Sequence, residues 1–267
     1  MDASTLHQRL VDWLTIYERI RTPQVEAAFR AVPRHHFLPT APLREVYRDT
    51  VIATKVIDGR FVSSSSQPSI MAEMLEQLGL EPGQRVLEIG TGTGYNAALL
   101  AHAVGETGQV TSVDLDEDTA STARQRLVEL GFGSVQVVCA DGNAGYLPNA
   151  PYDRVILTVG ATDIEPAWYE QLAPDGRLVV PLELIGQVMK VVAFERRDGY
   201  LESVSTANCT FMMLRGSVPE PPAGTLRIRA YPRPPDSSPA HRWVIVKPGT
   251  ELVCEYDPLS DDDESAP

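Results

Sequence analysis

The chain of 267 residues carries 23 Lys and Arg against 36 Asp and Glu, a formal net charge of −13. A chain this acidic is repelled by nucleic-acid phosphates, no apolar run is long enough to span a bilayer, and three widely spaced cysteines offer neither a disulfide framework nor metal-ligand spacing. The N-terminus also lacks the basic start and apolar core of a signal peptide, so we expect a cytoplasmic protein with no nucleic-acid, membrane or metal partner.

Residues 1–80 are predicted to form a helical segment on the substrate side of the molecule. Apolar residues at spacings of three and four, a Thr-Pro start and a Gln-Pro start predict three helices, over residues 4–19, 22–32 and about 68–78. Prolines punctuate residues 33–62, which are therefore expected to be irregular.

Residues 81–216 alternate between strand and helix patterns. Strands are predicted over residues 85–89, 109–113, 135–139, 152–159 and 176–180, and helices over residues 97–104, 118–130 and near Trp168. This alternation predicts a mainly parallel sheet with helices on both faces. No clear helix separates residues 188–194 from 208–214, so we expect an antiparallel far edge.

Residues 217–267 are predicted to form a proline-rich extension that ends in an acidic tail. They contain ten of the chain's 21 prolines, which favours irregular structure. Within them, residues 243–246 and 251–254 flank a Lys-Pro-Gly-Thr sequence, and we expect these two stretches to pair as a hairpin.

The first strand of the alternating region runs into a glycine-rich turn, residues 88–94, with glycines at Gly90, Gly92 and Gly94. Glycines there allow a tight turn and let backbone N–H groups approach a ligand closely. The turn is either a nucleotide-type site or only a strand-to-helix connection. Its spacing disfavours a dinucleotide, which would require glycine in place of Tyr95. An acid just before the turn, Glu88, suits a ligand with a cationic amino group.

Acids also end the next two strands. Asp114 lies 20 residues after Gly94, where a carboxylate can accept hydrogen bonds from both hydroxyls of a ribose. Asp141 ends the third strand, where it can accept the amino hydrogen of an adenine. The alternative for such acids is helix capping, particularly with Asp116 so close to Asp114. Three acids at successive strand ends favour S-adenosylmethionine as the cofactor.

Four segments together resemble the protein-L-isoaspartate O-methyltransferase family over roughly residues 5–216. They are Val32-Pro33-Arg34 with Phe37-Leu38-Pro39, Ser66-Gln67-Pro68, Val86 to Tyr95, and Leu172 to Pro181. Many methyltransferases share the glycine motif, but the Ser-Gln-Pro segment is specific to this family. The resemblance implies a class I methyltransferase fold, which is a doubly wound Rossmann-like α/β sheet, mainly parallel with an antiparallel edge.

The resemblance also implies roles for individual residues. The family's active-site serine falls on Ser66. The implied contacts to S-adenosylmethionine, or to S-adenosylhomocysteine as product, are Ser63, Ser64, Ser65, Glu88, Gly90, Gly92, Gly94, Asp114, Asp141 and Gly142. The implied substrate contacts are Ser66, Gln67, Met212, Met213 and Leu214. The last three occupy the family's Val-Pro-Leu position and lack its proline.

Two departures from the family pattern bear on the substrate. Residues 54–62 replace a glycine-rich segment, and the chain continues about 50 residues past the family's usual end. Both features resemble a branch associated with ribosomally synthesised, post-translationally modified peptides, such as lasso peptides and graspetides. We therefore predict methylation of an aspartyl carboxylate in such a peptide, leading to an aspartimide (succinimide). The alternatives are an enzyme that repairs isoaspartate in damaged proteins and a non-catalytic peptide-binding module.

Either enzymatic hypothesis needs little acid–base chemistry. A carboxylate acceptor, with a reference pKa near 4, is already ionised at neutral pH, so no strong general base is required. His35 and His36 are accordingly expected to be structural. Catalysis would come from positioning an acceptor oxygen about 3 Å from the methyl group, with the Ser66 hydroxyl and nearby backbone N–H groups holding the other oxygen.

Overall fold

The computed structural model describes residues 1–57, 59–183, 188–197 and 200–216, together with three strands beyond them. Its helices are α1 (Ala3–Ile16), α2 (Pro23–Ala31), α3 (Leu43–Val46), α4 (Pro68–Leu78), α5 (Tyr95–Val104), α6 (Glu117–Glu129) and α7 (Pro166–Gln171), with 3₁₀ turns η1 (Arg34–Phe37), η2 (Gly142–Ala144) and η3 (Leu147–Asn149). Its strands are β1 (Ile52–Ile57), β2 (Arg60–Ser65), β3 (Arg85–Ile89), β4 (Gln109–Asp114), β5 (Gln136–Cys139), β6 (Tyr152–Leu157), β7 (Leu172–Glu183), β8 (Met189–Arg197), β9 (Tyr200–Asn208), β10 (Ile228–Pro232), β11 (Val244–Val246) and β12 (Leu252–Tyr256).

The central sheet has eight strands in the order β11-β9-β8-β7-β6-β3-β4-β5. The strands from β7 to β5 are parallel to their neighbours, and β8, β9 and β11 add an antiparallel edge. The strand order reverses between β3 and β6, and ligands of open α/β sheets bind at the carboxyl edge beside such a reversal. The predicted fold class, with its antiparallel edge, is confirmed.

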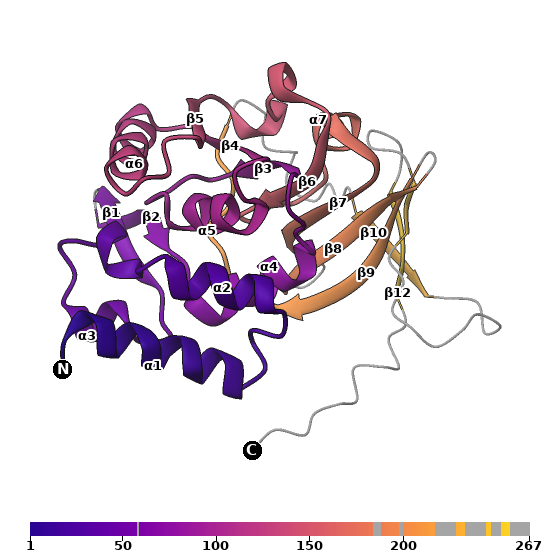
Figure 1. The fold of residues 1–267 in the computed structure, drawn as a ribbon. Helices are drawn as coiled ribbons and strands as arrows, with labels where there is room; N and C mark the ends of the chain where they lie inside the picture. The colour runs from indigo at the N-terminus through magenta and orange to yellow at the C-terminus, as the bar shows by residue number, and fades with distance from the viewer. Residues whose placement is uncertain are drawn as a thin grey trace.

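Two hydrophobic clusters cover the two faces of this sheet. Because side chains alternate along a strand, Val86 packs into one cluster with residues of α1, α2, α4 and α5, whereas Leu87 packs into the other with Trp168 of α7. Figure 1 shows the indigo N-terminal helices grouped along one side of the sheet. Residues 1–80 therefore share a core with the sheet, which fixes the elements that border the site.

The predicted helix starts in the first 80 residues are confirmed. The Thr22 hydroxyl caps α2 by accepting from the Val25 N–H, with Pro23 in the first turn, and α4 begins at Pro68. None of the described helices is both long and apolar enough to cross a lipid bilayer.

The expectation of irregular structure over residues 33–62 is wrong. That stretch contains η1, α3 and strand β1, and β1 pairs with β2 in an antiparallel hairpin. A recognisable signal was present, because Ile57 pairs with Arg60 across an Asp-Gly dipeptide, the sequence typical of two-residue hairpin turns. The prolines earlier in this stretch, taken as a sign of irregular structure, led us to overlook this hairpin signal.

Two predictions about the C-terminal strands also need correction. The last antiparallel strand of the main sheet before residue 217 is β9, over 200–208, whereas residues 209–212 form no regular strand. The described parts of the two stretches expected to form a hairpin, 244–246 and 252–254, do not pair with each other, and the turn between them lies outside the described residues. Strand β11 joins the edge of the main sheet beside β9, and β12 pairs in parallel with β10. A local turn sequence does not exclude partners that are distant along the chain.

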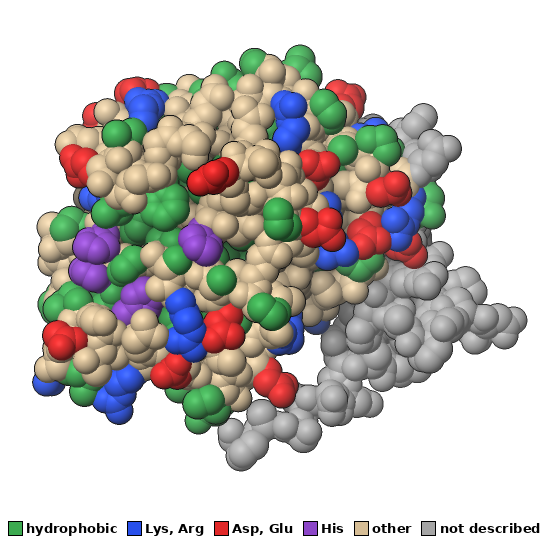
Figure 2. Space-filling view, in the orientation of Figure 1, with side chains coloured by type: hydrophobic (Ala, Val, Ile, Leu, Met, Phe, Trp, Pro, Cys, Tyr) green, Lys and Arg blue, Asp and Glu red, His purple; other side chains and the backbone are tan. Residues whose placement is uncertain are grey.

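Charged side chains are dispersed over the face seen in Figure 2. Acidic groups are interleaved with Lys and Arg, including those that gather on the right beside the grey residues, and no large patch has one sign. The excess of negative charge therefore does not mark a binding surface on this face.

Candidate active site

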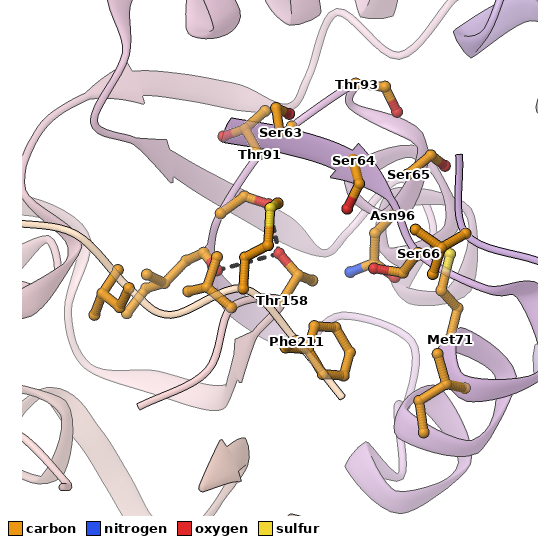
Figure 3. Close-up of a pocket in the computed structure, with 18 of the residues that line it drawn as sticks. Ser63, Ser64, Ser65, Ser66, Met71, Thr91, Thr93, Asn96, Thr158 and Phe211 are labelled. Atoms are coloured by element: carbon orange, nitrogen blue, oxygen red, sulfur yellow. Dashed lines mark hydrogen bonds between the residues drawn. The ribbon is translucent and has the colours of Figure 1, made fainter. Parts of the chain in front are cut away.

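One large pocket lies at the carboxyl edge of the parallel strands, and its volume is about 1220 Å³. Single-ligand pockets usually span roughly 300–1000 Å³, so this one has room for a cofactor and part of a second molecule. Its walls come from the end of the β1–β2 hairpin, the glycine turn, the end of β4 and residues 207–215. Figure 3 shows the serines of the hairpin on one side, with Thr158 and Phe211 across from them.

The glycine turn needs its glycines for conformation and for space. Gly90, Gly92 and Gly94 all have positive φ, at 104°, 52° and 86°. A Cβ atom at Gly90 would lie 2.5 Å from the Thr158 hydroxyl, which itself donates to the Gly90 carbonyl at 2.6 Å. Gly90 and Gly92 line the pocket, whereas Gly94 caps α5 and faces Leu127.

Glu88 lies beneath the turn and not on the pocket wall. Its carboxylate is fully buried and accepts hydrogen bonds from Asn96 Nδ2 at 2.8 Å and from the Ser112 hydroxyl at 2.5 Å. Ser112 is in turn paired with the hydroxyl of Thr91 at 2.6 Å. Burial raises the Glu88 pKa to about 7, opposed by these hydrogen bonds. Glu88 itself does not line the pocket, where the sequence predicted a direct contact with the cofactor. It is linked by hydrogen bonds to two residues that do line it, to Asn96 directly and to Thr91 through Ser112.

Asp114 lies at the end of β4 and lines the pocket. Its carboxylate accepts from the Gly92 N–H at 3.0 Å and from the Asp116 N–H at 3.1 Å, which ties the glycine turn to this strand. The helix-capping alternative belongs to Asp116, whose carboxylate accepts from the Thr119 N–H. Asp114 therefore does not cap α6, and its predicted contact with a ribose stays a prediction.

Asp116 also contacts the hairpin. Lys55 of β1 donates to it at 2.7 Å, and both residues line the pocket. The hydrogen bond from Lys55, with those from Thr119, lowers the Asp116 pKa to about 2. This ion pair joins the hairpin to the start of α6 at the pocket. It was not predicted, because the hairpin itself was not expected.

Asp141 does act as a cap. Its carboxylate accepts from the Asn143 N–H at 3.0 Å at the start of η2, and the backbone of Gly216 lies against it. Asp141 is not among the pocket-lining residues, so a contact with adenine there remains a prediction. The next residue, Gly142, lines the pocket, and a Cβ atom at that position would lie 2.4 Å from Ile89.

The predicted serine run borders the pocket from Ser63 to Ser66. Its members differ in orientation, because Ser63 accepts from Thr54 across the hairpin and Ser65 is only 5 % exposed, with its hydroxyl accepting from Arg34. Ser65 is therefore turned to the interior, away from the position expected of a side-chain contact with a cofactor. No hydrogen bond within the described residues engages the Ser66 hydroxyl.

Gln67 follows Ser66 in the pocket wall and is held by Asp49. The carboxylate of Asp49 accepts from Gln67 Nε2 at 2.7 Å and from the Ser69 N–H at 2.8 Å, at the start of α4. This contact fixes the direction in which the Ser-Gln-Pro segment enters its helix. Asp49 was not predicted, and only the structure brings it to Gln67.

Residues 212–214 line the pocket opposite the serines, as the resemblance implied. The Gly160 N–H donates to the Met212 carbonyl and the Leu214 N–H to the Gly160 carbonyl, each at 2.7 Å. The N–H of Met213 takes no part in this pairing. These two hydrogen bonds hold the backbone of residues 212–214 whether position 213 is methionine or proline, because neither bond uses the N–H of that residue.

The pocket fits the predicted cofactor in the chemistry of its walls. It offers a turn of close-approaching backbone, the carboxylate of Asp114 at the end of β4, and two polar side chains that hydrogen bonds link to Glu88, Asn96 directly and Thr91 through Ser112. None of the described histidines lines it. Within the described residues, no group of three or more His, Cys, Asp or Glu side chains is arranged to hold a metal ion.

This fold and the position of its pocket define a class I methyltransferase. A solved structure of a protein-L-isoaspartate O-methyltransferase superposes with a TM-score of 0.73 at 36 % identity, over 79 % of this chain and 66 % of that one. A structure from Plasmodium falciparum, in complex with S-adenosyl-L-homocysteine, gives a TM-score of 0.68 at 17 % identity, over 78 % of this chain and 98 % of that one, and supports the fold alone.

The family is more specific than the fold. Residues 5–218 match the Protein-L-isoaspartate(D-aspartate) O-methyltransferase family, and the chain belongs to it. The Protein-L-isoaspartate O-methyltransferase of Thermotoga maritima is 41 % identical over 179 residues, which are 66 % of this chain and 56 % of that protein. Protein-L-isoaspartate O-methyltransferase 2 of Archaeoglobus fulgidus is 36 % identical over 218 residues, 81 % of this chain and 95 % of that protein. The predicted family is confirmed, whereas no comparison supports the peptide-tailoring branch.

Proposed function

We propose that this chain is an S-adenosylmethionine-dependent methyltransferase that esterifies the carboxylate of an isoaspartyl residue in a protein or peptide. The observation that carries the proposal is the placement of Ser66-Gln67 opposite the glycine turn in one pocket, within a family match of residues 5–218. Curated relatives carrying the isoaspartate name align over most of the chain. The repair hypothesis therefore replaces peptide tailoring as the preferred one.

The residues of the pocket form two groups, one proposed to bind the cofactor and the other to bind the acceptor carboxylate. When bound, S-adenosylmethionine would supply an electrophilic methyl group on a cationic sulfur. Asp114, Gly90 and Gly92 would hold it, with Asn96 and Thr91 supported from below by Glu88. Ser66 would orient the acceptor carboxylate by donating its hydroxyl hydrogen to one carboxylate oxygen.

No residue of the pocket has to remove a proton. A carboxylate with a reference pKa near 4 is ionised at neutral pH and is already a nucleophile. The one described lysine in the pocket, Lys55, is paired with Asp116. The chain's contribution is therefore the orientation of two reactants, which can account for a large part of a rate enhancement.

The methyl ester is a better electrophile than the carboxylate from which it forms. The backbone nitrogen of the following residue attacks the ester carbonyl, loses its proton, expels methanol and closes a five-membered succinimide. Water then opens the ring, and one of the two possible openings restores a normal aspartyl linkage. This sequence follows from the chemistry of the ester and requires only that the enzyme make it.

A second candidate substrate is an ordinary aspartyl residue in a peptide designed to keep the succinimide. The hairpin sequence over residues 54–62 departs from the family pattern, and the chain extends beyond the matched residues 5–218. The two candidates differ in the linkage at the methylated residue, so one pair of peptides separates them.

The test uses two peptides of identical sequence, one with isoaspartate and one with aspartate, incubated with enzyme and S-adenosylmethionine. Mass spectrometry follows the gain of a methyl group and the later loss of methanol. We expect methylation of the isoaspartyl peptide only. Methylation of the aspartyl peptide alone would instead favour tailoring, and methylation of neither would refute the proposed function for peptides of that sequence.

The role of Ser66 is tested by Ser66→Ala. Losing a hydrogen bond to a charged acceptor costs roughly 1.5–3 kcal/mol, so methyl transfer should fall about 10- to 100-fold while the Kd of the cofactor stays nearly unchanged. Ser69→Ala, which removes a hydroxyl three residues further along, is the matched control and should change the rate by less than about threefold. Equal losses of cofactor affinity and rate in Ser66→Ala would rule out the assigned role.

A further inference from the structure

Arg34 is buried directly behind the Ser-Gln-Pro segment, and the mechanism above does not use it. It lies in η1, and the residue is only 1 % exposed. Its guanidinium donates to the carbonyls of Ser66 at 2.8 Å and Val46 at 2.9 Å, and to the Ser65 hydroxyl at 3.2 Å. A buried side chain therefore holds the backbone on which the proposed acceptor site is built.

The charge of this guanidinium has no carboxylate partner. Within the described residues, no acid lies at salt-bridge distance from Arg34, and its Nε atom has no hydrogen-bond acceptor. Asp49 is the one carboxylate among the groups that stabilise this cation electrostatically, and it accepts its hydrogen bonds from Gln67 and Ser69. Burying an unpaired charge is costly, so its retention calls for a reason beyond packing.

The hydrogen bond to Ser66 fixes the orientation of the next peptide group. In a trans peptide the C=O bond and the following N–H bond point in nearly opposite directions. Because Arg34 draws the Ser66 carbonyl toward the interior, the N–H of Gln67 points the other way, on the side where Ser66 and Gln67 line the pocket. That N–H donates to no protein acceptor among the described residues.

We propose that Arg34 is a positioning residue for the acceptor site, with two effects. It directs the Gln67 N–H into the pocket as a donor for the acceptor carboxylate, and its unneutralised charge favours an anionic acceptor over a neutral one. This inference rests on the proposed function, because it assigns the acceptor to the Ser66-Gln67 side of the pocket. It explains how so acidic a chain can hold an acidic substrate.

The charge is tested by measuring how strongly each enzyme prefers a carboxylate. The probes are an isoaspartyl peptide and the same peptide with that carboxylate replaced by a primary amide, titrated into enzyme saturated with S-adenosylhomocysteine. Arg34→Gln should lower the ratio of the two affinities about tenfold, as expected for one charge acting over a short distance in a partly polar interior. Arg34→Lys keeps the positive charge, so it should retain most of the preference for the carboxylate peptide over the amide peptide. It should still lower kcat, because an ammonium group cannot make all the hydrogen bonds that the guanidinium makes. An unchanged ratio in a folded Arg34→Gln enzyme would overturn the electrostatic part.

The directed N–H is tested without touching the buried arginine. Gln67 has a φ of −59°, which proline adopts without strain, so Gln67→Pro keeps this dihedral angle and replaces the N–H hydrogen with a ring carbon. Gln67→Ala is the matched control, because it loses the same side chain and keeps the N–H. The isoaspartyl peptide should bind Gln67→Pro roughly tenfold or more weakly than Gln67→Ala. Equal binding by the two variants would overturn the positioning part, even if wild-type enzyme methylates isoaspartate as proposed.

Discussion

Replacing Glu88 with glutamine should make the protein's stability less sensitive to pH. The carboxyl of Glu88 is fully buried under the glycine turn, and its pKa rises from 4.5 to about 7. Glutamine has nearly the same shape and stays neutral. Because the hydroxyls of Ser112 and Thr91 can each donate or accept, the network can reverse its direction to receive the new amide N–H.

The size and sign of the effect follow from proton linkage. Between pH 4.5 and pH 7 the folded state of the wild type binds more protons at Glu88 than the unfolded chain does, so its stability falls as the pH rises through this window. The loss levels off above the folded-state pKa. Integrating these two pKa values from pH 5 to pH 8 gives a loss of about 2.5 kcal/mol that Glu88→Gln should not suffer.

Equilibrium unfolding in urea at pH 5 and at pH 8, without cofactor, measures this difference. All other titrating groups are common to both proteins, so subtracting one stability from the other isolates position 88. The free energy of unfolding of Glu88→Gln relative to wild type should rise by about 2.5 kcal/mol between the two pH values. A rise below about 1 kcal/mol would mean that the buried carboxyl ionises as readily as in the unfolded chain, which would refute the reasoning.

Three further changes probe the cofactor half of the pocket. Asp114→Ala should weaken cofactor binding about 10- to 100-fold in a calorimetric titration while leaving peptide affinity intact, and an unchanged cofactor Kd would contradict its role. Gly90→Ala should lower stability by about 1–3 kcal/mol in thermal unfolding, because its Cβ would approach the Thr158 hydroxyl at 2.5 Å; a stable variant would show that the turn can shift. Lys55→Met removes the partly exposed contact with Asp116, so stability should change by less than about 1 kcal/mol, but release of S-adenosylhomocysteine should quicken in stopped-flow measurements. Unaltered release would show that the ion pair does not retain the cofactor.

The cofactor half of the site was predictable because local rules determine it. A strand that runs into glycines and then into a helix can form few structures, and the carboxyl ends of parallel strands must meet at one edge, which brings Asp114 beside Gly92. The same reasoning could not orient side chains. Whether an acid lines the pocket, as Asp114 does, or supports the turn from below, as Glu88 does, depends on which face of the strand packs against a helix.

The acceptor half was predictable only through the family resemblance. Ser66 and Gln67 carry no local signal of function, and the groups that hold them, Arg34 and Asp49, lie 32 and 18 positions earlier in the chain. Arg34 follows a proline in a short 3₁₀ turn, where an arginine ordinarily reaches solvent. Only the structure shows that it is buried, with its guanidinium donating to the Val46 carbonyl of α3 and to the Ser65 hydroxyl of β2.

The two halves of the pocket carry opposite charge, and this arrangement bears on turnover. On the cofactor side, the Asp114 carboxylate lines the pocket with no cationic partner among the described residues, because Lys55 is paired with Asp116. The guanidinium of Arg34, which has no carboxylate partner, lies behind the acceptor side. Each half therefore attracts a charged reactant, a cation on one side and a carboxylate on the other. Transfer of the methyl group leaves a neutral thioether and a neutral ester, so both halves lose their electrostatic attraction at the same moment. Because a pocket that binds reactants through charge binds neutral products less tightly, the proposed reaction would itself promote release of its products.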